Sequence, residues 1–257
     1  MKTSLCNCIA LYDYNPEKCN LKEWFQYMDQ WADEIDIPWE SIGSNLGRKL
    51  LLYKNGIRKY EKLEYIGIDN MSMFGGVSEP GTYLDWKTYT HFSTKGEGLR
   101  GTMGLCFPDT QKPFTQENLI PILKSLLKFA DFKYGIGYQR PYNMGPPLYV
   151  SGSLGGIDLP EKEERKIGQW KRSYIFDDGN YRTGLLRDVY PFNILVNTHL
   201  TEPVGHKTLE AWIDSDPRHG ALDKITHSHW LWSVDPQHIP LAQEALQEAG
   251  LLLCYKV

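Results

Sequence analysis

Hydrophobic residues recur at helical spacing directly after Asn20. One face collects Leu21, Trp24, Phe25, Met28, Ala32 and Ile35, and charged or amide side chains such as Asp29 occupy the opposite face. Asn20 and Glu23 also have the spacing of a capping box. The pattern therefore predicts an amphipathic helix that begins after Asn20 and buries one side.

Residues 50–108 change to the pattern of strands and turns. The β-rich runs LEYIGID, YLDWKTYTHFST and LRGTMGLCF are separated by the turn-prone sequences FGGVSEPGT and KGEG. A helical pattern returns over residues 116–130, with Pro121 in its first turns, where the missing N–H costs little. YGIGYQR then predicts a further strand, and the first strand is expected near the N-terminus, in place of a signal peptide.

A segment rich in glycine and proline, residues 143–164, divides the chain. Beyond it the pattern predicts short helices over 162–171 and 206–214, an extended run over 185–197, a strand around HSHWLWSV, a helix over 241–249 and a last strand, LLLCYKV. The order predicts an α+β fold with mixed, largely antiparallel sheets and flanking helices. An N-terminal α+β part (1–142) and a C-terminal α+β part (165–257) would flank the seam, either as two related lobes or packed as a single domain.

Composition narrows the class of function. The chain has 257 residues, a net charge of −4 and 13% aromatic residues, and it lacks long basic runs and long apolar runs. A nucleic-acid-binding protein normally carries a basic face, and a bilayer span needs about 18 or more apolar residues. We therefore expect neither direct nucleic-acid binding nor a membrane span. Mild acidity is compatible with a basic protein partner.

The histidines and cysteines are the first candidates for chemistry. On a strand, His227 and His229 would share one face, and the alternative function is a metal-dependent hydrolase that uses this pair. His206, His219 and His238 are distant in sequence, and the HExxH motif is absent. The five cysteines (Cys6, Cys8, Cys19, Cys106 and Cys254) are widely spread and lack the paired CxxC spacing of zinc sites. Half-exposed histidines and reduced cysteines of a cytoplasmic protein are the preferred interpretation.

Other catalytic patterns are incomplete. SGSLGG has its glycines at the wrong offsets for a nucleophile elbow and, like FGGVSEPG, does not match a phosphate-binding loop. Asp85 and Lys87 fit part of a nuclease motif, but the additional carboxylate is missing. Arg187 and Asp188 open an apolar run, where a buried pair would be structural and an exposed pair could line a binding surface.

Two acidic clusters, EKEER and FDDGN, are candidates for partner binding. Their carboxylates are Glu161, Glu163, Glu164, Asp177 and Asp178. Each cluster taken alone fits a solvated helix start or a turn, and together they could form a docking surface for a basic partner.

Three segments carry a family likeness: GLLRDVYPFNILVNTHL, GHKTLEAWIDSDPRHGAL and HWLWSVDPQHIPLAQEALQEAGLL. They resemble the C-terminal half of bacterial immunity proteins from polymorphic-toxin and type VI secretion loci, with the immunity protein fifty-two family as the closest fit. FKYGIGYQRPYNMGPPLYVSG extends the likeness over about residues 98–257. The matched motifs are structural and transfer no toxin-contacting residue.

The resemblance implies a cytoplasmic protein that neutralises a cognate secreted toxin by stoichiometric binding, without catalysis and without a cofactor. The toxins of that family resemble restriction-endonuclease-fold DNases. Charge reversal in the acidic clusters should then weaken the association with the toxin.

Overall fold

The computed structural model describes residues 4–14, 20–47, 49–76, 86–95, 100–153, 157, 159–176 and 181–255. The strands are β1 (Leu5–Tyr14), β2 (Trp39–Ser44), β3 (Leu51–Leu52), β4 (Asn70–Gly75), β5 (Thr88–Lys95), β6 (Arg100–Pro108), β7 (Tyr134–Pro141), β8 (Phe192–Val196), β9 (Pro203–Val204), β10 (Lys207–Thr208), β11 (Ala221–Lys224) and β12 (His229–Ser233). The α-helices are α1 (Leu21–Glu34), α2 (Tyr53–Lys62), α3 (Gln116–Leu126), α4 (Pro146–Ser151), α5 (Glu161–Phe176), α6 (Asn197–Leu200), α7 (Leu209–Ile213) and α8 (Ile239–Glu248). None of the helices within these ranges is long and apolar enough to cross a bilayer.

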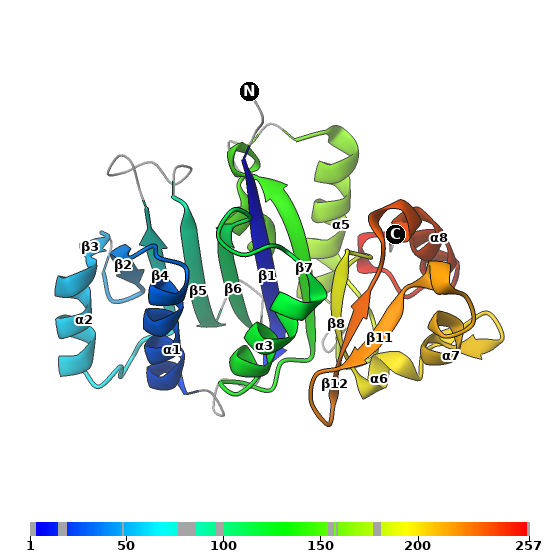
Figure 1. Cartoon of the computed structure of the whole chain (residues 1–257), viewed down its shortest axis with the longest axis horizontal. Helices are drawn as coiled ribbons and strands as arrows, with labels where there is room; N and C mark the ends of the chain where they lie inside the picture. The colour runs from blue at the N-terminus through cyan, green and yellow to red at the C-terminus, as the bar shows by residue number, and fades with distance from the viewer. Residues whose placement is uncertain are drawn as a thin grey trace.

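One twisted sheet organises the molecule (Figure 1). Its strand order is β11-β12-β8-β7-β1-β6-β5-β4-β2-β3, and β9 and β10 form a separate small pair. Neighbouring strands of the large sheet pair antiparallel, which confirms the predicted α+β class with largely antiparallel sheet. Because β7 pairs with β8 through Gly135, Ile136 and Gly137, strands from both halves of the chain share this sheet. The boundaries proposed at 142 and 165 stay predictions.

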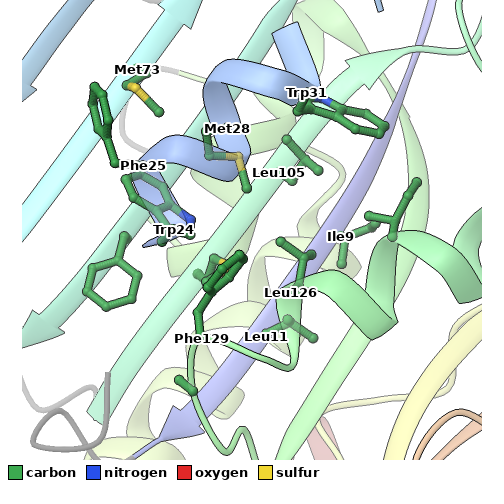
Figure 2. Close-up of a cluster of buried hydrophobic side chains, with 14 of the residues drawn as sticks. Ile9, Leu11, Trp24, Phe25, Met28, Trp31, Met73, Leu105, Leu126 and Phe129 are labelled. Atoms are coloured by element: carbon green, nitrogen blue, oxygen red, sulfur yellow. The ribbon is translucent and has the colours of Figure 1, made fainter. Parts of the chain in front are cut away.

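The sheet is buried on both faces, and β1 shows why. Successive side chains of a strand point to opposite faces. Ile9 and Leu11 enter one core with the apolar faces of α1 and α3, and Ala10 and Tyr12 enter a second core with α5 and the C-terminal elements. Figure 2 shows the first core, in which the helical side chains point toward the strands.

Helix α1 follows the prediction closely. The Asn20 side chain accepts a hydrogen bond from the backbone N–H of Glu23 at 3.1 Å and thereby caps the helix. Its apolar face buries Trp24, Phe25 and Met28, together with Trp31, which the predicted face did not include.

Three local predictions are wrong. Residues 53–62 form α2, and residues 63–67 form turns in place of the predicted strand, with Glu64 and Tyr65 at positive φ. Residues 225–228 are the turn between β11 and β12, so His227 is not on the strand. At the C-terminus, Leu252 makes one parallel bridge to Leu186, and residues 253–255 form a 3-10 turn in place of a strand.

Candidate functional site

Three of the five acidic residues predicted to bind a partner, Glu161, Glu163 and Glu164, lie at the start of α5. Glu163 forms an ion pair with Arg140, whose side chain is buried, and Glu161 pairs with Arg165 at 3.2 Å on the exposed surface. Glu164 is exposed, and Asp177 and Asp178 lie outside the described residues. Carboxylates in a first turn also stabilise the helix electrostatically. Part of this negative charge therefore has a structural role, and partner binding by the patch stays a prediction.

The two histidines of the alternative hydrolase are separated by the turn. His227 is exposed. His229 is buried, with Nε2 at 2.9 Å from the Phe132 carbonyl and Nδ1 at 2.9 Å from the Thr226 hydroxyl. Burial lowers the pKa of His229. Both ring nitrogens of His229 are therefore engaged within the protein, and the predicted shared strand face does not form.

One group of metal-ligating side chains does converge. Within the described ranges, the only group of three or more Cys, His, Asp or Glu side chains with mutually close ligand atoms is Cys6, Cys8 and Cys106. Cys254 is buried elsewhere, and Cys19 and Asp85 lie outside the described residues.

Arg187 and Asp188 are both buried, but their side chains contact different partners. The Arg187 guanidinium donates to the Tyr12 hydroxyl and to the Tyr149 carbonyl at 2.9 Å each, and it lies 3.7 Å from the centre of the Trp170 ring. Asp188 accepts from Lys166 at 2.9 Å and from the Gln243 side chain at 2.8 Å. These contacts tie β1 and α5 to the C-terminal elements. Because both side chains are buried, they do not line an exposed binding surface.

An open groove runs between α1 and α2, at the end of the sheet opposite α7 and α8 (Figure 1). Its apolar lining comes from Leu21, Phe25, Ile57 and Tyr65. The ring centre of Tyr65 lies 5.8 Å from that of Phe25, and the Tyr53 ring stacks on Phe25 at 6.1 Å. The groove thus has an aromatic floor that is anchored in the α1 core.

Carboxylates surround this floor. Asp29 on α1, Glu61 on α2 and Glu64 in the following turn all line the groove and are exposed, and Lys22 is the one basic residue of the lining among the described residues. The Tyr53 hydroxyl donates to Asp29 at 2.5 Å. Burial raises the pKa of Tyr65, and the negative charges of Glu61 and Asp29 raise it further. Within the lining, carboxylates therefore outnumber basic side chains, while Lys54, Arg58, Lys59 and Lys62 lie on the exposed surface of α2 outside the lining.

Exposed hydrophobic side chains, called the apolar rim below, gather in the part of the chain that contains β3 and α2. Five of the seven large hydrophobic side chains that are exposed in the described chain fall between residues 46 and 66: Leu46, Leu50, Leu52, Leu63 and Ile66. Leu52 and Ile66 are more than 70% exposed, and they flank α2 in the sequence. Concentrated exposed hydrophobic residues commonly mark protein-binding surfaces.

The groove lining suits a basic side chain of a partner protein. An aromatic floor with nearby carboxylates can bind a lysine or arginine side chain through cation–π and ionic contacts, and leucine side chains can add apolar contact area. The sequence alone did not single out these residues. It placed Asp29 on a solvated helix face, and it predicted a strand where Glu64 and Tyr65 turn the chain.

Comparison with known proteins supports the fold. Among solved structures, the Pseudomonas aeruginosa T6SS protein PA0821 superposes with a TM-score of 0.61 at 12% sequence identity, over 97% of this chain and 73% of that chain. At this level of identity the likeness establishes a shared fold. No family model matches the chain, and no curated protein does either.

Proposed function

We propose that this protein is an immunity protein that binds and neutralises a cognate toxin of a type VI secretion system. The observation that carries the proposal is the acidic, aromatic groove between α1 and α2, together with the apolar rim. The shared fold with a T6SS protein supports the context, and the resemblance to the immunity protein fifty-two family supports the role. Inhibition would occur in the cytoplasm by stoichiometric binding, without catalysis.

The toxin is proposed to be a nuclease with a basic DNA-binding face. Such a face is lined by lysine and arginine side chains that normally contact phosphates. Asp29, Glu61 and Glu64 would compete with DNA for these side chains, and Tyr65 would pack against their aliphatic stems. Binding through the groove would therefore keep DNA from the toxin.

Co-expression with a candidate toxin, sought in the genes beside this one, tests the function. The wild-type chain should restore growth of cells that express the toxin and should form a one-to-one complex measurable by calorimetry. The charge reversals Asp29→Lys and Glu61→Lys should together weaken binding by at least about tenfold, because each places a repulsive charge opposite a basic face. Failure of the wild-type chain to bind or protect would reject the immunity function.

Two control variants locate the surface. Glu244→Lys changes the same charge on the exposed face of α8, at the other end of the sheet, and should leave binding within about twofold. Glu161→Lys with Glu164→Lys tests the start of α5 in the same assay. If this pair weakens binding and the groove pair does not, the acidic patch of α5 replaces the groove as the toxin-binding site.

A further inference from the structure

Three cysteine side chains meet on the face of the sheet opposite α1. Cys6 and Cys8 are two residues apart on β1 and therefore point to the same side. Cys106 on β6 lies directly opposite Cys8 in the antiparallel register. All three are at most 1% exposed. The spacing in the sequence gives no sign of this group, because the third member depends on the β1–β6 register.

The sulfur atoms are nearly in position to share one metal ion. The Sγ atoms of Cys6 and Cys8 are 3.9 Å apart, and all three Sγ atoms lie within 4.8 Å of one another. Sulfurs at about 2.3 Å from one ion in a planar trigonal site are separated by about 4 Å. The Cys6–Cys8 distance already meets this requirement, and a shift of less than about 1 Å at Cys106 would complete the site.

The surroundings favour a soft ion of low coordination number. A small cavity of about 10 Å³ touches Cys6 and Cys106, with Trp86, Tyr89 and Tyr142 among its other walls. This space holds at most about one water molecule. Within the described residues, no fourth Cys, His, Asp or Glu belongs to the group. Zinc normally takes four ligands, whereas Cu(I) is selected by soft thiolate sulfur.

We propose that Cys6, Cys8 and Cys106 bind one Cu(I) ion through their three sulfur atoms, at a site independent of the groove. Each sulfur that binds as a thiolate releases its proton to solvent, and the copper stays in the +1 state throughout. The ion would link β1 to β6 at the centre of the sheet.

Anaerobic titration of the purified full chain with Cu(I), in competition with the chelator bicinchoninate, tests the proposal. One ion per chain should bind, with an ultraviolet thiolate-to-copper absorption band and a rise in the melting temperature. X-ray absorption of the wild-type complex should show three sulfur neighbours. This last measurement does not depend on any variant. Coordination by two sulfurs, or no binding stronger than that of the chelator, would overturn the proposal.

Alanine variants test whether Cu(I) binding depends on the three-cysteine group or on the other buried thiol, Cys254. Cys106→Ala should lower the Cu(I) affinity by at least about a hundredfold, since loss of a mere outer-shell partner already costs ten- to a hundredfold. Cys254→Ala removes a similarly buried thiol outside the group and should keep the wild-type affinity. Circular dichroism checks that both variants fold. Equal affinities of the two variants would overturn the assignment, as would tighter binding of Zn²⁺ with a fourth, non-sulfur ligand.

Discussion

His199 is a fully buried histidine whose two ring nitrogens are both hydrogen-bonded within the protein. Nδ1 accepts from the Val196 backbone N–H at 3.2 Å, and Nε2 lies 3.2 Å from the Leu185 carbonyl. This arrangement needs the neutral ring, with the proton on Nε2. Burial lowers the pKa of His199 to about 4, and burial does the same for His91. Protonation of either side chain therefore costs free energy in the folded state.

Because these histidines are buried, we expect the folded protein to lose stability in acid. An unfolded chain protonates histidine near pH 6.5, but folded His199 does so only near pH 4. Between these values the unfolded state binds more protons, so the free energy of unfolding should fall as the pH falls from about 6.5 to 4. His199→Gln retains a donor and an acceptor but does not titrate. Its free energy of unfolding, measured with urea at several pH values, should therefore depend less on pH, by up to about 1.4 kcal/mol per pH unit.

His206→Gln is the matched control for this experiment, because His206 is exposed. This variant should keep the slope of the wild type. If His199→Gln also keeps that slope, burial of His199 does not contribute to the acid sensitivity.

At the scale of elements, the position of α2 decides whether the groove exists. The helix packs on β2 through Gly56, where an added Cβ would lie 2.0 Å from the Cγ2 atom of the fully buried Ile42. Such a contact is far inside van der Waals distance. Gly56 therefore sets how closely α2 approaches the sheet, and with it the separation between Glu61 and Asp29 across the groove.

Gly56→Ala should destabilise the protein although it raises helix propensity. Alanine normally gains about 1 kcal/mol over glycine inside a helix. Here the methyl group overpacks the contact with Ile42, which typically costs 1–3 kcal/mol, so a net loss of stability and a weaker complex with the toxin are expected. Gly168→Ala on α5 is the control, since its added Cβ meets only the Arg172 side chain at 3.8 Å. Urea unfolding and calorimetry measure both effects, and a stabilised Gly56→Ala variant would contradict this packing.

Sequence patterns predicted the elements that bury a periodic face. The helix after Asn20 and the strand YGIGYQR follow directly from their spacing. Helix α2 was missed although Tyr53, Gly56, Ile57 and Tyr60 have helical spacing, because the helix is short, contains a glycine and follows an apolar run that resembles a strand. The apolar run after Gly250 predicted a strand but is buried as a 3-10 turn, since burial by tertiary contacts leaves the same hydrophobic signal as a strand.

The candidate sites depended on tertiary contacts that no local pattern encodes. Exposed carboxylates such as Asp29 look the same in sequence whether they face solvent or a groove. Their place in the groove became visible only in the structure, where Asp29 of α1 and Glu61 of α2 line the same groove. Likewise, Cys106 joins Cys6 and Cys8 through strand register.

At the scale of the whole molecule, the groove occupies one end of a long sheet, and α7 and α8 occupy the other (Figure 1). The net charge of −4 is small for 257 residues. A modest overall charge gives little long-range attraction, because salt screens exposed charges within about 8 Å at physiological ionic strength. If the proposed toxin binds at the groove, the nearby carboxylates Asp29, Glu61 and Glu64 should provide the short-range electrostatic attraction toward it.

This arrangement predicts that the association rate depends on salt mainly through the groove. Raising the ionic strength from low to about 0.5 M should slow association of the wild-type chain with the toxin by tenfold or more, while dissociation changes little. Asp29→Asn combined with Glu61→Gln removes the charge with little change of shape and should flatten this dependence. Glu244→Gln on α8 should leave it unchanged. Stopped-flow kinetics measure the rates, and equal salt dependence in the wild type and the double variant would show that the attraction arises outside the groove.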